Sequence, residues 1–106
     1  MIVHVVLFRP KSDISESDRA DMYTALQLAA REIPTVRRFY IGDRLRHGAG
    51  YEPLMQQDFP FAAIIEFDDL GGLRTYLEHP QHKALGQLFY RLQDVSLAYD
   101  YEVRAL

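Results

Sequence analysis

Two short segments that are apolar on both faces restrict most strongly what this chain can fold into. Within Ile2–Phe8 only His4 is polar, and within Phe61–Phe67 only Glu66 is polar. Short runs rich in β-branched and aromatic residues are typical of strands. A strand that is apolar on both faces belongs in a sheet that is covered on both sides. The sequence therefore predicts a doubly covered sheet, although the chain has only 106 residues.

A helix is predicted between these two strands. Ser15 is a suitable N-cap, and Asp18 follows three residues later in the position of a capping-box acid. Pro34 restricts Ile33 to extended conformations and ends the helix there. Between these ends the apolar residues recur at helical spacing, so one face of the helix is expected to pack against the sheet.

The remaining segments predict two more strands and a second helical region. Residues 36–45 and 95–103 alternate between apolar and polar side chains, as strands with one wet face do. Residues 46–58 contain glycine and proline without periodicity, and a loop of that length in a small domain is often functional. The helical pattern that follows Asp68 and Asp69 is interrupted at His79-Pro80, because the residue before proline avoids helical geometry.

The resulting order, β-α-β-β-α-β, predicts a ferredoxin-like α+β fold over residues 1–106 as a single domain. Both helices would cover one face of a four-stranded antiparallel sheet. The other face would lie open, although its first and third strands are apolar there. We expect a second copy of the chain to cover it, giving a homodimeric α/β barrel. The alternative is that the long loop buries these residues.

Composition excludes several classes of function. The net charge is −3 and no basic run is present, so nucleic acid is not an expected partner. The absence of cysteine excludes thiolate chemistry and cysteine-bound zinc. No apolar run approaches the roughly 18 residues of a membrane span, and the N-terminus lacks the features of a signal peptide. A cytoplasmic protein without a membrane partner is expected.

Several motifs, taken in order, resemble one known family. They are IVHVVLFRPK, the Ile33-Pro34-x-Val36 turn, FAAIIEF, YLEHPQH and AYDYEV. Their joint order is similar to that of the stress-responsive dimeric A/B barrel (Dabb) proteins over essentially the whole chain. The resemblance implies a homodimer whose sheets form a barrel, with a cavity between helices and sheet in each protomer.

The resemblance also implies a candidate site. One enzyme of the family is a polyketide cyclase that closes a ring by an aldol reaction, and a plant hydroxynitrile lyase is similar to the family. The cyclase residues match Tyr76, His82 and His4 here, so cofactor-free cyclase or lyase chemistry on a small carbonyl compound is implied. His79 and Phe89 are expected to lie beside the substrate. The connection at residues 46–58 differs from that of the cyclase, so its substrate is not carried over.

Physical reasoning supports the same residues. If Pro80 begins a helix, His82 is the third helical residue, where the positive end of the helix dipole disfavours a protonated imidazole. A neutral histidine near pH 7 suits a general base. The hydroxyl of Tyr76 could donate a hydrogen bond to a carbonyl that becomes an enolate.

Other interpretations stay open at this point. His79 could simply cap a helix, His82 could bond the backbone, and His4 could be a core histidine bonded to Tyr99 or Tyr101. The chain would then be a non-catalytic dimeric protein that binds a ligand or partner under stress. A monooxygenase is suggested by fold analogy alone. No cofactor is expected, and no metal, because no acidic ligand stands at a recognisable spacing from His79 and His82.

Overall fold

The structure is a computed structural model that describes all residues, 1–106. Its elements follow the chain as β1 (Ile2–Pro10), α1 (Glu16–Glu32), β2 (Arg38–Asp43), the short 3-10 helix η1 (Glu52–Leu54), β3 (Phe61–Phe67), α2 (Leu70–Glu78), α3 (Pro80–Leu92) and β4 (Gln93–Glu102). The strands form one antiparallel sheet in the order β2-β3-β1-β4.

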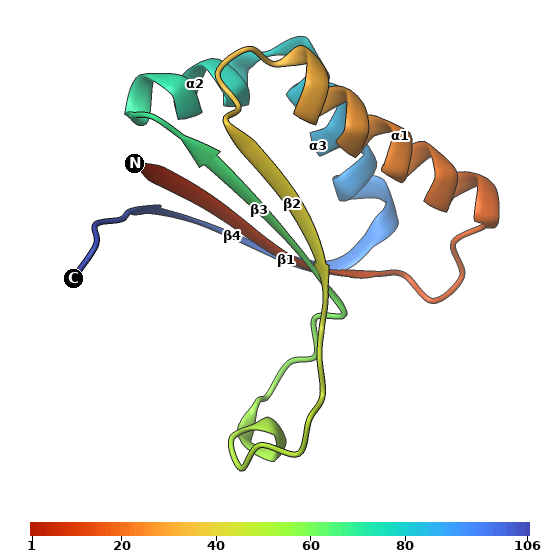
Figure 1. Cartoon of the computed structure of the whole chain (residues 1–106). Helices are drawn as coiled ribbons and strands as arrows, with labels where there is room; N and C mark the ends of the chain where they lie inside the picture. The colour runs from red at the N-terminus through yellow and green to blue at the C-terminus, as the bar shows by residue number, and fades with distance from the viewer.

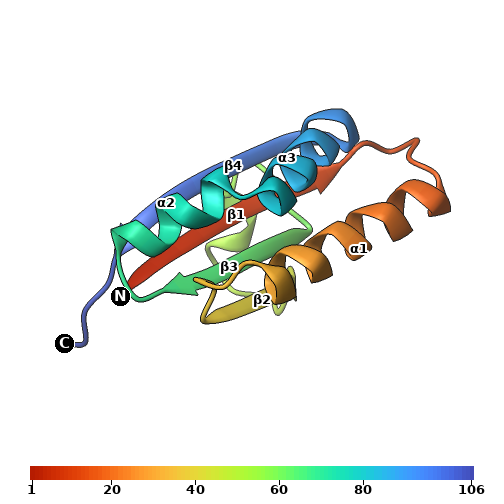
Figure 2. The same ribbon diagram turned by 90° about the horizontal axis from the view of Figure 1, so that it is seen from above.

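The helices all lie on one face of this sheet, which confirms the ferredoxin-like α+β fold (Figure 1). Seen from above, α1 runs along one side of the helical layer, and α2 and α3 together run along the other (Figure 2). The second helical region is therefore two helices, α2 and α3, that meet at His79. No helix is both long and apolar enough to cross a membrane.

Local sequence signals explain most of these boundaries. The hydroxyl of Ser15 accepts a hydrogen bond from the backbone N–H of Asp18 at 3.0 Å, which is the predicted N-cap of α1. The predicted third strand agrees with β3 at both ends. The predicted second strand was too long, because pairing begins only at Arg38 and ends at Asp43. Residues 36 and 37 instead lie in the turn that follows α1.

The register of the sheet places His4 among residues from distant parts of the chain. His4 lies opposite Ile65 of β3 and opposite Asp100 of β4. Directly paired residues in a sheet share a face. This is the face that packs against the helices, because Ile65 belongs to the buried core together with Leu26 and Tyr76. The sheet thus places His4 at the interface between the two layers.

The opposite face of the sheet remains largely open in the single chain. Tyr99 and Tyr101 are 50% and 53% exposed, and Tyr40 and Ile64 are also exposed. The loop of residues 44–60 hangs on this side, away from the helices (Figure 1). It covers only one end of the face, where it and the strands line a groove of about 480 Å³. The loop therefore does not bury the face as a whole.

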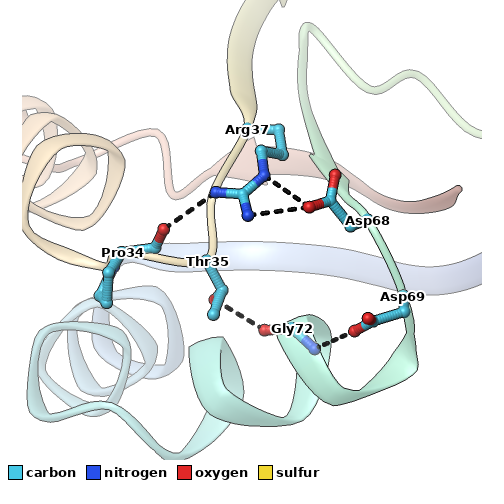
Figure 3. A network of polar contacts seen from close by, with 6 residues as sticks. All are labelled: Pro34, Thr35, Arg37, Asp68, Asp69 and Gly72. Atoms are coloured by element: carbon cyan, nitrogen blue, oxygen red, sulfur yellow. Dashed lines mark hydrogen bonds and ion pairs between the residues drawn. The ribbon is translucent and has the colours of Figure 1, made fainter.

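A polar junction fixes the start of α2 against the turn that follows α1 (Figure 3). The hydroxyl of Thr35 donates to the carbonyl of Gly72 at 2.8 Å, and Asp69 caps α2 by accepting from the Gly72 N–H at 2.8 Å. Nearby, Arg37 donates to Asp68 at 2.8 Å and holds the pKa of that carboxyl below its usual range. These contacts anchor the helix that carries Tyr76.

Candidate active site

A pocket between the helices and the sheet is lined by four of the five predicted site residues. Its volume is about 240 Å³, and its walls are mostly apolar. His4 comes from β1, Tyr76 from α2, and both His82 and Phe89 from α3. The aromatic rings lie in a chain, with centroids 5.8 Å apart for His4 and Tyr76 and 4.7 Å apart for Tyr76 and His82. The fold therefore brings together residues up to 85 positions apart in the sequence, from His4 to Phe89.

The backbone fixes the tautomer of His82. Its Nδ1 lies 3.1 Å from the carbonyl oxygen of Leu77, which can only accept, so Nδ1 carries the proton. In the neutral ring Nε2 is then left with a free lone pair. Burial lowers the pKa of His82, and the nearby His4 acts in the same direction, while the bond to Leu77 opposes both. The result is a histidine held neutral with Nε2 as its basic atom.

Tyr76 is almost completely buried but forms no side-chain hydrogen bond within the chain. Its exposed fraction is 1%, and its ring packs at 5.2 Å from that of Phe67. Burial raises the pKa of its hydroxyl, so the group stays protonated at any physiological pH. A protonated hydroxyl in an apolar pocket is a hydrogen-bond donor for a ligand oxygen.

His4 is paired with an aspartate, and not with Tyr99 or Tyr101, the partners considered in the alternative interpretation of this histidine. Its Nδ1 lies 2.6 Å from Oδ1 of Asp100. Tyr99 and Tyr101 are on the other face of β4, because neighbouring residues of a strand alternate between faces. In the sequence, Asp100 is one of the polar residues that alternate along 95–103, and nothing in that pattern indicates this contact. Asp100 orients His4, leaving Nε2 as the ring nitrogen without a partner in the chain.

His79 is the one predicted site residue outside this pocket. It is the N-cap of α3, and its Nδ1 accepts from the backbone N–H of Gln81 at 3.1 Å. A side-chain acceptor at this position satisfies one of the free N–H groups of the first helical turn. Its position in the sequence therefore serves to separate α2 from α3 and to place His82 in the first turn of α3.

The pocket continues to the outer surface of α3. Leu77, His82 and Gly86 line both the pocket and a shallower groove on the outside of the helix. A Cβ atom built on Gly86 would meet no other atom within 4 Å. The glycine thus leaves open space beside His82, where a ligand could enter.

No group of three or more histidine, cysteine, aspartate or glutamate side chains is arranged to hold a metal ion. The polar groups that face the pocket are imidazoles, a phenol and the hydroxyl of Ser96. This set can exchange protons and donate hydrogen bonds to an organic ligand.

The fold and the pocket define a ferredoxin-like α+β protein with a cavity between its helices and its sheet. The chain belongs to the stress responsive A/B barrel domain (Dabb) family, whose profile matches residues 2–103. No curated protein sequence matches it.

Solved structures share the fold. A hydroxynitrile lyase from Passiflora edulis superposes with a TM-score of 0.82 at 14% identity, with 99% of this chain and 94% of that chain covered. A dimeric ferredoxin-like protein of unknown function from Thermobifida fusca superposes with a TM-score of 0.75 at 24% identity. The match covers 96% of this chain and 90% of that chain. A Dabb family protein from Mesorhizobium loti superposes with a TM-score of 0.73 at 23% identity, and the match covers 98% of this chain and 97% of that chain. At these identities the likeness concerns the fold alone.

Proposed function

We propose that the chain is a cofactor-free cyclase or lyase that acts on a small carbonyl compound. The observation that carries this proposal is the pairing of a neutral His82 with a protonated Tyr76 in one apolar pocket. A base and a hydrogen-bond donor on one carbonyl compound are what enolate chemistry requires. The pocket volume of about 240 Å³ suits a compact organic ligand.

In this mechanism His82 removes a proton from the carbon next to the carbonyl. The C–H electron pair moves into the carbonyl, and the negative charge that develops on oxygen is stabilised by the hydroxyl of Tyr76. The enolate carbon then forms a bond to a second carbonyl carbon, and the oxygen of that carbonyl takes the proton back from His82. The reverse sequence breaks a C–C bond, so the same residues support a cyclase or a lyase.

His4 and Asp100 act as a positioning pair in this proposal. The carboxylate of Asp100 holds Nδ1 of His4, so that the ring keeps one orientation beside Tyr76. Nε2 of His4 remains available to a ligand oxygen. Phe89 contributes an apolar wall on α3.

The structural relative from Passiflora edulis supports lyase chemistry, since it is a hydroxynitrile lyase. The alternative is a non-catalytic protein that binds a ligand or a partner under stress. The contacts of His79 and His82 also fit that alternative, because each histidine bonds the backbone. The two functions differ in whether bound ligand is converted.

We also propose that the chain forms a homodimer through the open face of its sheet. Tyr40, Tyr99 and Tyr101 are exposed there in the single chain, together with Ile64 and Leu97. Apolar patches of this kind usually mark an interface. The relative from Thermobifida fusca is dimeric. The loop of residues 44–60 hangs on the same side (Figure 1), and its exposed Leu45 and Met55 line a groove together with Ile64, where they would contact the partner.

The function is tested by screening for two reactions. Small ketones are incubated with the protein in D2O, and deuterium incorporation next to the carbonyl is followed by NMR. Cleavage of aromatic cyanohydrins to the aldehyde is followed by absorbance. Turnover in either assay that needs His82 supports the enzyme, whereas tight binding without any turnover favours the non-catalytic alternative.

A further inference from the structure

A second pocket lies at the other end of the helical layer, between α1 and the start of β4. Its volume is about 160 Å³, and its interior is formed by buried apolar side chains that include Phe8, Met22 and Leu92. Tyr23 and Ile41 also line it and are exposed, so they mark its opening to solvent.

Arg19 and Gln93 bring the polar groups to this pocket. Arg19 is exposed, whereas Gln93 is buried. Gln93 is only 7% exposed, and its Oε1 is fully buried and forms no hydrogen bond. An unpaired buried polar atom is costly, and such atoms are few in native proteins. Gln93 is the first residue of β4 and the C-cap of α3, so its backbone is fixed by two elements. The side chain is thus held in an apolar pocket with an unused hydrogen-bonding group.

The Gln93 pocket is separate from the candidate active site, although the two lie end to end. On β1 and β3 the active-site pocket is lined by Val6 and Ala63, whereas this pocket is lined by Phe8 and Phe61. The ring of Phe8 stacks on Phe61 with centroids 5.6 Å apart and meets the edge of Phe89 at 4.9 Å. Leu26 lines both pockets, so the two adjoin beside this aromatic group.

We propose that the Gln93 pocket is a ligand site for an apolar group that carries a hydroxyl. The apolar walls would contact the hydrocarbon part, and the amide of Gln93 would bond the hydroxyl. A hydroxyl both donates and accepts, so it pairs with the amide whichever way the amide is turned. In another protein, a cavity of roughly 150 Å³ with apolar walls takes up benzene, so a ring of phenol size fits.

Two sources of such a group are possible in chemical terms. The hydroxyl can belong to a separate small molecule, or to the far end of a longer carbonyl compound whose carbonyl lies at His82 and Tyr76. In the second case the inference rests on the proposed function. Binding measurements test the Gln93 pocket independently of the proposed reaction, because they need no turnover.

The test compares phenol with toluene, which has the same shape but no hydroxyl. Both are titrated into the wild-type chain and into Gln93→Met, which keeps the side-chain length and removes the amide. Binding is followed through backbone amide NMR shifts of residues around Met22 and Leu92. We expect Gln93→Met to lower the phenol-to-toluene affinity ratio at least about fivefold, the factor that corresponds to one lost neutral hydrogen bond.

The same ratio in both proteins would overturn the proposal, as would shifts confined to the surroundings of His82, or no binding of either probe at millimolar concentration. Gln93→Met should fold, because it removes an unpaired buried group, and Gln93→Leu provides a second variant with the same expectation. His82→Asn is the matched control and should leave the ratio unchanged.

A final titration with 6-hydroxyhexan-2-one identifies the source. If it displaces phenol and shifts residues of both pockets, the hydroxyl belongs to a longer carbonyl compound. If phenol and acetophenone instead bind together without competition, the Gln93 pocket takes a separate molecule. Either result supports the site, and a failure of the proposed reaction would not affect it.

Discussion

Nδ1 of His4 lies 2.6 Å from Oδ1 of Asp100, and the two residues sit directly opposite each other on the neighbouring strands β1 and β4. The imidazole is buried, whereas the carboxylate side chain is 45% exposed. The pair therefore joins the interior of the pocket to its solvent edge. A short contact between an imidazole N–H and a carboxylate is among the stronger hydrogen bonds in proteins.

Loss of this contact should destabilise the chain. We expect Asp100→Ala to lower the free energy of unfolding by about 1 kcal/mol, because it leaves Nδ1 of buried His4 without an acceptor. Asp100→Asn keeps an acceptor oxygen and should cost less. Urea unfolding measures both, with Glu102→Ala on the same strand as the control. Equal stability of Asp100→Ala and the wild type would show that the contact contributes nothing.

Stability should depend on the protonation of His82. Burial lowers the pKa of His82 below its ordinary value of 6.5, so the unfolded chain takes up this proton more readily than the folded chain. The stabilisation is therefore complete above pH 6.5 and is lost as the pH falls through 6.5 towards the lower, folded value. The pKa values of Glu52, Asp58 and Asp68 are also lowered in the folded chain, so their contribution to stability is likewise lost as the pH falls, but at more acidic pH.

The contribution of His82 is isolated by His82→Asn, whose side-chain amide can still donate to the carbonyl of Leu77. Urea unfolding of both proteins between pH 7.5 and 5.5 gives the dependence. The variant should lose less stability over this range than the wild type. If the variant instead lost more stability than the wild type as the pH falls, His82 would bind its proton more tightly in the folded chain than in the unfolded chain. That result would contradict a pKa lowered by burial.

Gly86 should control access to the pocket. Gly86→Ala fills open space in the middle of α3 and should raise the free energy of unfolding by roughly 0.5–1 kcal/mol without blocking ligands. Gly86→Phe should fold but slow or abolish ligand binding, since its ring would occupy the mouth beside His82 and Leu77. Ala84→Phe, on the exposed side of the same helix, is the control. Unchanged binding in Gly86→Phe would place the entrance elsewhere.

The homodimer should depend on the open face of the sheet. Tyr99→Lys and Ile64→Lys place charges in the proposed interface, and we expect each to weaken dimerisation by about tenfold or more in Kd. Tyr90→Lys changes a residue that is 92% exposed on α3 and should have no effect. Sedimentation equilibrium distinguishes the variants. A monomeric wild type, or a loss of dimer only with Tyr90→Lys, would contradict this interface.

The sequence predicted local features well because they depend on neighbouring residues. The Ser15 cap and the interruption at His79-Pro80 are fixed by chemistry within a few residues. The side chains of His4 and Tyr76 could be assigned to faces of their elements in the same way. The start of β2 was harder to predict, since residues 36 and 37 belong to the turn after α1, where Arg37 donates to Asp68.

The partner of His4 could not be predicted, because it depends on the register between two strands that are about 90 residues apart. The alternation along β4 placed Asp100 on a polar face, which indicated that its side chain points into solvent. Only the pairing of β1 with β4 shows that this face of β4 lies beside His4, at the border of the pocket. The Gln93 pocket was likewise invisible in sequence, because it is formed where α1, α3 and both central strands meet.

The most direct test of the central claim is the rate of hydrogen–deuterium exchange next to the carbonyl of acetophenone, compared between wild type and three variants. We expect His82→Asn to slow the protein-dependent rate about a hundredfold and Tyr76→Phe to slow it at least tenfold. The double variant should be no slower than the worse single variant, because the two residues act on one transition state. Exchange at the same rate in all four proteins, or no exchange above buffer with the wild type, would contradict a base and a hydrogen-bond donor acting together in this pocket.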